Sequence, residues 1–120
     1  MKTKILFFPL FVAIFVLSAV PSFAASSQNG LTEVKPEKVC MINNQLFEKD
    51  QIPVQVEGKT YYGCCQMCEK RLKNDPSSRM AVDPVSGKQV DKASSVIAAA
   101  PDGSIFYFES KESMSKFSAQ

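Results

Sequence analysis

The chain of 120 residues contains no histidine and no tryptophan. Without histidine it can form neither a Ser-His-Asp triad nor a Cys-His nucleophile pair, and it has no imidazole to act as general acid, general base or metal ligand. These absences exclude the usual hydrolases. The length suits one or two very small folded units and does not suit a multidomain enzyme.

The first 24 residues differ in composition from the rest. Lys2 and Lys4 precede an almost unbroken apolar run over 5–20, and Ser22-Phe23-Ala24 places small residues at the two positions that a signal peptidase reads. The run is shorter than the roughly 20 residues that a membrane-spanning helix needs. We therefore expect residues 1–24 to be a secretory signal peptide, and the protein to be periplasmic or secreted with no membrane insertion after the leader is removed.

Removal of the leader leaves a neutral chain with little aromatic content. Lys2 and Lys4 are lost with it, so the 14 basic residues fall to 12 and balance the 12 acidic ones. A balanced charge gives no reason to expect nucleic acid or an anionic membrane as a partner. More than half of the phenylalanines also leave, and such a thin core usually needs a disulfide or metal staple. All four cysteines remain.

The pattern after the leader predicts an α+β fold of two tandem units. Residues 25–38 are mostly polar and are expected to be a flexible arm. Beyond them, one order of hairpin and helix is expected twice, over 52–56, 60–62 and 65–73, and again over 95–100, 105–108 and 110–117. We therefore expect a cysteine-bearing unit at 39–76 and a cysteine-free unit at 77–120.

Aligning the two units shows which chemistry the second one lacks. Cys40 falls on Ser86, and the helix-start cysteines Cys64, Cys65 and Cys68 fall on Glu109, Ser110 and Ser113. The second unit is thus expected to persist as scaffold without a thiol site. Asp83 and Asp91 have no evident partner in the sequence and are given no catalytic role.

These residues resemble a known class of domain. A single cysteine, a hairpin ending in Tyr61-Tyr62, and Cys64-x-x-x-Cys68 entering a helix resemble the treble-clef-like TRASH and YHS domains, which are associated with heavy-metal trafficking, resistance and sensing. The second copy keeps an Asp83-Pro-Val-Ser-Gly opening similar to that of YHS, with serine where that family has cysteine. The resemblance implies two zinc-knuckle-like units and metal binding by Cys40, Cys64 and Cys68.

Sulfur chemistry leads to the same expectation independently. Clustered thiolates suit Zn(II), Cu(I), Cd(II) or Hg(II) far better than magnesium or calcium. The start of a helix also lowers thiol pKa values. Cys65 is expected either to point aside or to close a fourth position. Met41 and Met67 each lie beside a cysteine, where they are either thioether ligands that favour Cu(I) or simple core residues.

The expected function is capture or transfer of copper or zinc, with a metal-transport or resistance protein as partner and no enzymatic turnover. Two alternatives remain open. Four cysteines in an oxidising compartment can staple a small interaction module, with Cys40 bridged to a helix-start cysteine. Less favoured is a thiol-disulfide oxidoreductase, because Cys65-Gln66-Met67-Cys68 has Cys-x-x-Cys spacing without a thioredoxin-like pattern around it.

Overall fold

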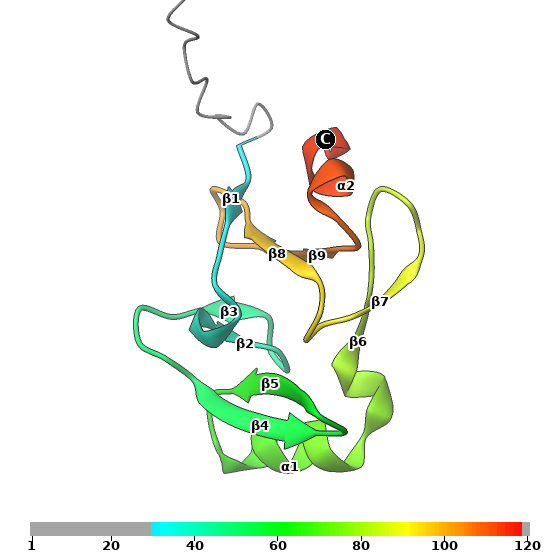
Figure 1. Ribbon diagram of the computed structural model, residues 1–120. Helices are drawn as coiled ribbons and strands as arrows, with labels where there is room; N and C mark the ends of the chain where they lie inside the picture. Colours follow the sequence, from blue (N-terminus) through cyan, green and yellow to red (C-terminus); the bar gives the residue numbers. More distant parts are fainter. Residues whose placement is uncertain (1–29, 119–120) are drawn as a thin grey trace, which may run out of the picture.

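The computed structural model describes residues 30–118, so the expected signal peptide and residues 25–29 of the expected arm lie outside the described part (Figure 1). The described strands are β1 (Thr32–Glu33), β2 (Val39–Cys40), β3 (Gln45–Leu46), β4 (Ile52–Val56), β5 (Lys59–Gly63), β6 (Met80–Val82), β7 (Gln89–Asp91), β8 (Val96–Ala99) and β9 (Ile105–Phe108). The helices are α1 (Gln66–Asn74) and α2 (Lys111–Lys116), with short 3₁₀ turns at Pro36–Lys38 and Pro76–Arg79. The expected α+β class is confirmed.

Each unit combines a β-hairpin, a following helix and a small two-stranded knuckle. The first has the β4–β5 hairpin with α1 packed against it, and its knuckle is β2–β3. The second has the β8–β9 hairpin followed by α2, and its knuckle is β6–β7. Figure 1 shows β4, β5 and α1 at one end of the molecule and β8, β9 and α2 toward the other.

The segment expected to be a flexible arm is ordered where the structure describes it. Strand β1 pairs with the open edge of β8, with Thr32 opposite Ala99 and Glu33 opposite Ala98. Leu31 is 1% exposed and packs in a cluster with Ala98 and Phe108. The expectation was wrong for residues 31–38, because the gain from burying one leucine and pairing an edge strand outweighs the polar composition around it.

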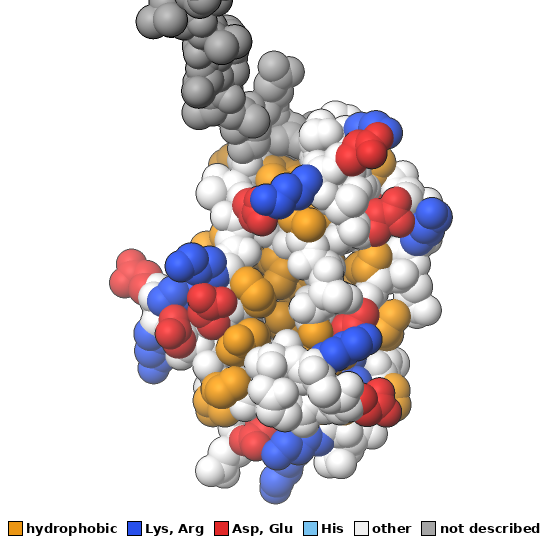
Figure 2. All heavy atoms as spheres, in the orientation of Figure 1, with side chains coloured by type: hydrophobic (Ala, Val, Ile, Leu, Met, Phe, Trp, Pro, Cys, Tyr) orange, Lys and Arg blue, Asp and Glu red, His pale blue; other side chains and the backbone are white. Residues whose placement is uncertain are grey.

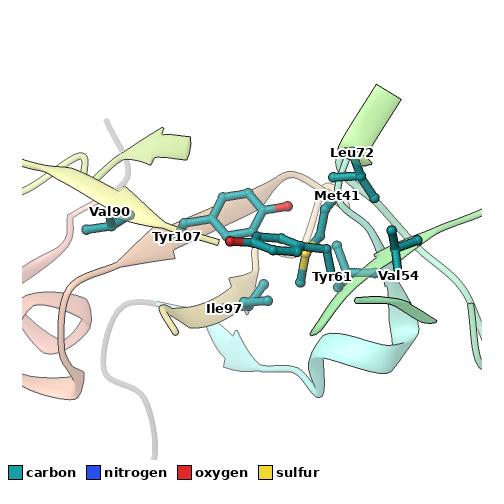
Figure 3. Packing of buried hydrophobic residues seen from close by; sticks show 8 residues of the cluster. Met41, Val54, Tyr61, Leu72, Val90, Ile97 and Tyr107 are labelled. Carbon is teal, nitrogen blue, oxygen red and sulfur yellow. The ribbon is translucent and has the colours of Figure 1, made fainter. Parts of the chain in front are cut away.

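One hydrophobic cluster joins the two units. It contains Tyr61 from the first hairpin and Tyr107 from the second. The other buried members are Val39, Met41, Val54, Leu72, Val90 and Ile97. Figure 3 shows residues of both units converging on this cluster. Because neither hairpin has a separate core of this size, the units stabilise each other.

On the face in view, no large area of the surface carries charges of only one sign. Figure 2 shows lysine and arginine side chains interspersed with aspartate and glutamate around a central apolar area. This distribution agrees with the balanced charge of the chain after residue 24. Within residues 30–118, no helix has the length and apolar character required to cross a bilayer.

Candidate metal centre

Cys40 enters the site from a tight knuckle. It ends β2, is completely buried, and its carbonyl accepts a 2.8 Å hydrogen bond from the backbone N–H of Asn44. Asn44 has φ 53°, a left-handed conformation that asparagine tolerates better than most residues. The turn folds back on the strand and exposes the N–H groups of Ile42 and Asn43 to the Cys40 sulfur.

The other cysteines come from the junction of β5 with α1. Cys64 follows the strand and is exposed, Cys65 is the N-cap of α1, and Cys68 is buried in the first turn. The spacing of four between Cys64 and Cys68 brings both onto one side of the helix start. The structure thus assembles sulfurs from a knuckle and a helix N-terminus, as the sequence predicted.

Three sulfurs gather at a spacing that fits one metal ion. The Sγ atoms of Cys40, Cys64 and Cys68 all lie within 4.8 Å of one another. Cys68 Sγ is 3.9 Å from Cys40 Sγ and 3.7 Å from Cys64 Sγ. An ion about 2.3 Å from each sulfur needs sulfur–sulfur separations of about 3.8 Å in tetrahedral geometry and about 4.0 Å in trigonal geometry. The cysteine cluster can therefore hold a metal ion with little rearrangement.

A glycine lets the helix approach the strand at this point. A Cβ atom added at Gly63 would lie 2.9 Å from the Cβ of Cys68 and 3.4 Å from the backbone of Cys68 and Glu69. No ordinary side chain fits that gap without moving the helix start. Gly63 therefore sets the distance between β5 and Cys68.

The cysteine pKa values in the cluster diverge. Burial raises the pKa of Cys40, but backbone N–H groups of Asn43 and Ile42 outweigh burial and lower it. Burial, together with hydrogen bonds to Cys65 and Cys64, raises the pKa of Cys68 to about 12. Protons are thus shared unevenly among the sulfurs, and a bound metal ion must displace them.

Cys65 lies beside the cluster. Its Sγ is 3.4 Å from Cys68 Sγ, but it is not one of the three whose sulfurs gather within 4.8 Å. Its side chain is exposed, and hydrogen bonds from the backbone and thiol of Cys68 are the first causes that lower its pKa. Two arrangements were expected for Cys65. The structure fits the one in which Cys65 points aside better than the one in which it supplies a fourth ligand to the metal ion.

The two methionines occupy opposite environments. Met41 is fully buried in the shared core, and Figure 3 shows its thioether among the rings of Tyr61 and Tyr107. Met67, in the first turn of α1, is 80% exposed and is the most exposed large apolar side chain among those described. Met41 therefore sits as a core residue, whereas Met67 is free of the core.

In the second unit, Asp83 occupies the position of Cys40. Asp83 precedes a turn in which its carbonyl accepts from the Gly87 N–H, as the Cys40 carbonyl does from Asn44. Its carboxylate accepts from the N–H groups of Val85 and Ser86, the counterparts of Ile42 and Asn43. The predicted match of Cys40 with Ser86 was therefore wrong by three residues. The clue in the sequence was the turn residue, because Asn44 and Gly87 both suit a left-handed conformation.

The remaining matches of the second unit are those the sequence predicted. Ser110 is the N-cap of α2, as Cys65 is of α1, and Ser113 is buried in its first turn, as Cys68 is. The Ser113 hydroxyl and the Glu109 N–H both donate to Asp83. A fully satisfied carboxylate thus fills the place where the first unit has its cysteine cluster.

Two residues of the second unit hold the Cys40 knuckle, and no pattern in the sequence indicated either contact. The buried ammonium of Lys92 donates to the Met41 carbonyl at 2.6 Å. The Tyr107 hydroxyl donates to the Asn44 side-chain carbonyl at 2.9 Å. The knuckle is therefore fixed from outside by protein contacts that require no metal.

A scan against models of protein families finds no match to this chain, and searches of curated proteins and of solved structures find no significant similarity.

Proposed function

We propose that this protein binds one soft metal ion, Cu(I) or Zn(II), through the thiolates of Cys40, Cys64 and Cys68. The observation that carries the proposal is the gathering of these three sulfurs within 4.8 Å, at separations that match metal–thiolate bond lengths. The resemblance of the motif to TRASH and YHS domains agrees with this assignment. We place the protein outside the cytoplasm, as the N-terminal sequence indicates.

The arrangement favours an ion that is exchanged over one that holds the fold together. The shared core and the hydrogen bonds donated by Lys92 and Tyr107 position the knuckle without an ion. Cys64, Cys65 and Met67 are exposed at the same edge of the site, where a second protein can reach the sulfurs. Trafficking or resistance, with transfer to a metal-transport protein, is therefore the role that we assign.

Native mass spectrometry of the reduced protein without residues 1–24 tests the proposal. We expect one Cu(I) or Zn(II) per chain, and loss of that ion on Cys40→Ser. The matched control is Ser86→Ala, which removes a side chain from the corresponding turn of the second unit and should leave the stoichiometry unchanged. Absence of metal from the unsubstituted protein at micromolar ion concentrations would contradict the proposal.

The strongest competing function is thiol-disulfide exchange. Cys65 is exposed at a helix N-cap with a lowered pKa, and Cys68 lies 3.4 Å away, buried, with a raised pKa. An accessible thiolate beside a buried resolving thiol is the arrangement used by Cys-x-x-Cys oxidoreductases. Insulin reduction separates the two functions, because a metal carrier has no activity in that assay.

A stapled module without metal is the third candidate. It requires a disulfide, whereas all four cysteines are free in the structure. Thiol counting on protein taken from its native compartment distinguishes it. A stapled module gives two free thiols or none after chelator treatment, and a metal carrier gives four.

A further inference from the structure

Lys92 is a buried cation that has no carboxylate partner in the described part of the chain. It is 7% exposed, and none of the ion pairs found among residues 30–118 includes it. Its ammonium donates to the Met41 carbonyl at 2.6 Å and lies 5.2 Å from the centre of the Tyr107 ring. A carbonyl and an aromatic face offset only part of the cost of removing an ammonium from water.

The charged groups around Lys92 point to the cysteine cluster as its counter-charge. Burial lowers the pKa of Lys92, and among nearby charges Arg71 lowers the pKa further, whereas ionised Cys40 raises it. Asp91, adjacent in sequence, is already engaged by Lys59 and by the Tyr61 hydroxyl. A negative charge on the thiolates therefore fills the role that a carboxylate usually plays.

We propose that Lys92 is the counter-charge of the loaded metal site and that it favours monovalent over divalent soft ions. The proposal rests on the proposed metal-binding function. Three thiolates around a monovalent ion carry a net charge of −2, and around a divalent ion −1, by simple addition of charges. The buried ammonium interacts more favourably with the more negative complex, and burial keeps that interaction from being screened as it would be at the surface.

This assignment also gives the second unit a role. Lys92 follows β7 in that unit, yet its charge lies beside the residue after Cys40. The second unit has no thiol of its own, since all four cysteines belong to the first. It thus acts on the site by supplying a positive charge, and Lys92 is a positioning residue that touches the knuckle without being a ligand.

The test compares two ions on the same variants. Lys92→Met keeps the length and removes the charge, and Lys92→Gln keeps an N–H donor for the Met41 carbonyl. Lys111→Met, at an exposed lysine of the second unit, is the matched control. Affinities for Cu(I) are measured against a chromophoric chelator, and affinities for Cd(II) by thiolate-to-metal absorbance under competition. Thermal unfolding of the metal-free forms identifies which variants are folded.

We expect both Lys92 variants to lose roughly tenfold more affinity for Cu(I) than for Cd(II), and Lys111→Met to change neither. Lys92→Arg, which retains the charge, should restore the preference. Equal losses for the two ions would mean that Lys92 only supports the knuckle, and would overturn the proposal while leaving metal binding intact. If the unsubstituted protein binds neither ion, the proposed function itself fails, and this is seen before any variant is compared.

Discussion

The hydroxyl of Ser113 donates a 2.6 Å hydrogen bond to the carboxylate of Asp83, at the place where Cys68 faces Cys40 in the other unit. The same Asp83 oxygen also accepts from the Glu109 N–H at 2.8 Å. Two units with one backbone plan thus close their knuckles onto their helices by different means. The second uses a carboxylate surrounded by donors, and we propose that the first uses thiolates around an ion.

The hydrogen-bonded carboxylate of Asp83 predicts that the protein loses stability in acid. Burial raises the pKa of Asp83, but hydrogen bonds from Ser113, Glu109, Val85 and Ser86 outweigh burial and lower it to about 2. Because the pKa of Asp83 in the folded protein lies below the unfolded value of 3.8, the ionised carboxylate stabilises the fold above that pH. This contribution disappears as the pH falls through about 2. The shift corresponds to about 2 kcal/mol.

Urea unfolding of the metal-free, reduced protein at several pH values between 7 and 2 checks this loss. Asp83→Asn should be less stable at pH 7 by about 2–4 kcal/mol, since an amide cannot accept all four donors. The difference between the two proteins should shrink as the pH falls below 4. Parallel stability curves down to pH 2 would show that Asp83 does not supply the pH dependence.

The equivalence of the two knuckles predicts that a second metal site can be built. Replacing Asp83, Glu109 and Ser113 together by cysteine puts thiols at the positions that match Cys40, Cys64 and Cys68. The triple variant should bind two ions per chain by native mass spectrometry. The double variant that keeps Asp83 should bind one. A folded triple variant that still binds a single ion would contradict the structural equivalence.

Much of this structure follows from local signals in the sequence. The hairpin around Glu57–Gly58 and the helix begun by Ser110 were correctly predicted, because turn residues and caps act over a few positions. The convergence of Cys40 with Cys64 and Cys68 was also predicted. In that case the helical spacing of four related Cys64 to Cys68, and the resemblance to TRASH and YHS domains implied that Cys40 joins them.

The errors involve contacts between residues distant in sequence. Leu31 was assigned to a flexible arm, and only the open edge of β8 explains its burial. Nothing in the sequence singled out Lys92, although its side chain reaches a carbonyl 51 positions earlier. Composition and periodicity describe a segment and its neighbours, and they carry no information about which distant edge or carbonyl that segment will meet.

Gly63→Ala is predicted to damage the metal site more than the fold. The added methyl would lie 2.9 Å from the Cys68 Cβ, so the start of α1 must shift and carry the Cys68 sulfur with it. We expect a stability loss of about 1–3 kcal/mol and a loss of metal affinity of at least about tenfold. Isothermal titration with Zn(II) and thermal unfolding measure the two effects.

The control for Gly63 is Gly58→Ala in the turn of the same hairpin. Gly58 has φ 77° and no atom within 4 Å of an added Cβ. This change should cost about 1 kcal/mol of stability, because alanine disfavours a left-handed backbone. It should leave metal affinity unchanged. Equal metal affinities for the two variants would refute the role given to Gly63.

Cys65→Ser is predicted to stabilise the protein without removing its metal. Cys65 caps α1 with φ −156° and ψ 173°, but its sulfur is a weak acceptor for the Cys68 N–H, whereas Ser110 caps α2 with φ −158° and ψ 165° and accepts from the Ser113 N–H through oxygen. A serine at 65 should accept likewise from the Cys68 N–H, adding about 0.5–1 kcal/mol to the free energy of unfolding. Metal stoichiometry should stay at one, while Cys64→Ser should lower the affinity by at least about 100-fold. Loss of the ion in Cys65→Ser would instead identify Cys65 as a ligand. Denaturant unfolding and metal titration of Cys65→Ser and Cys64→Ser therefore decide whether Cys65 is only a helix cap or a fourth sulfur donor.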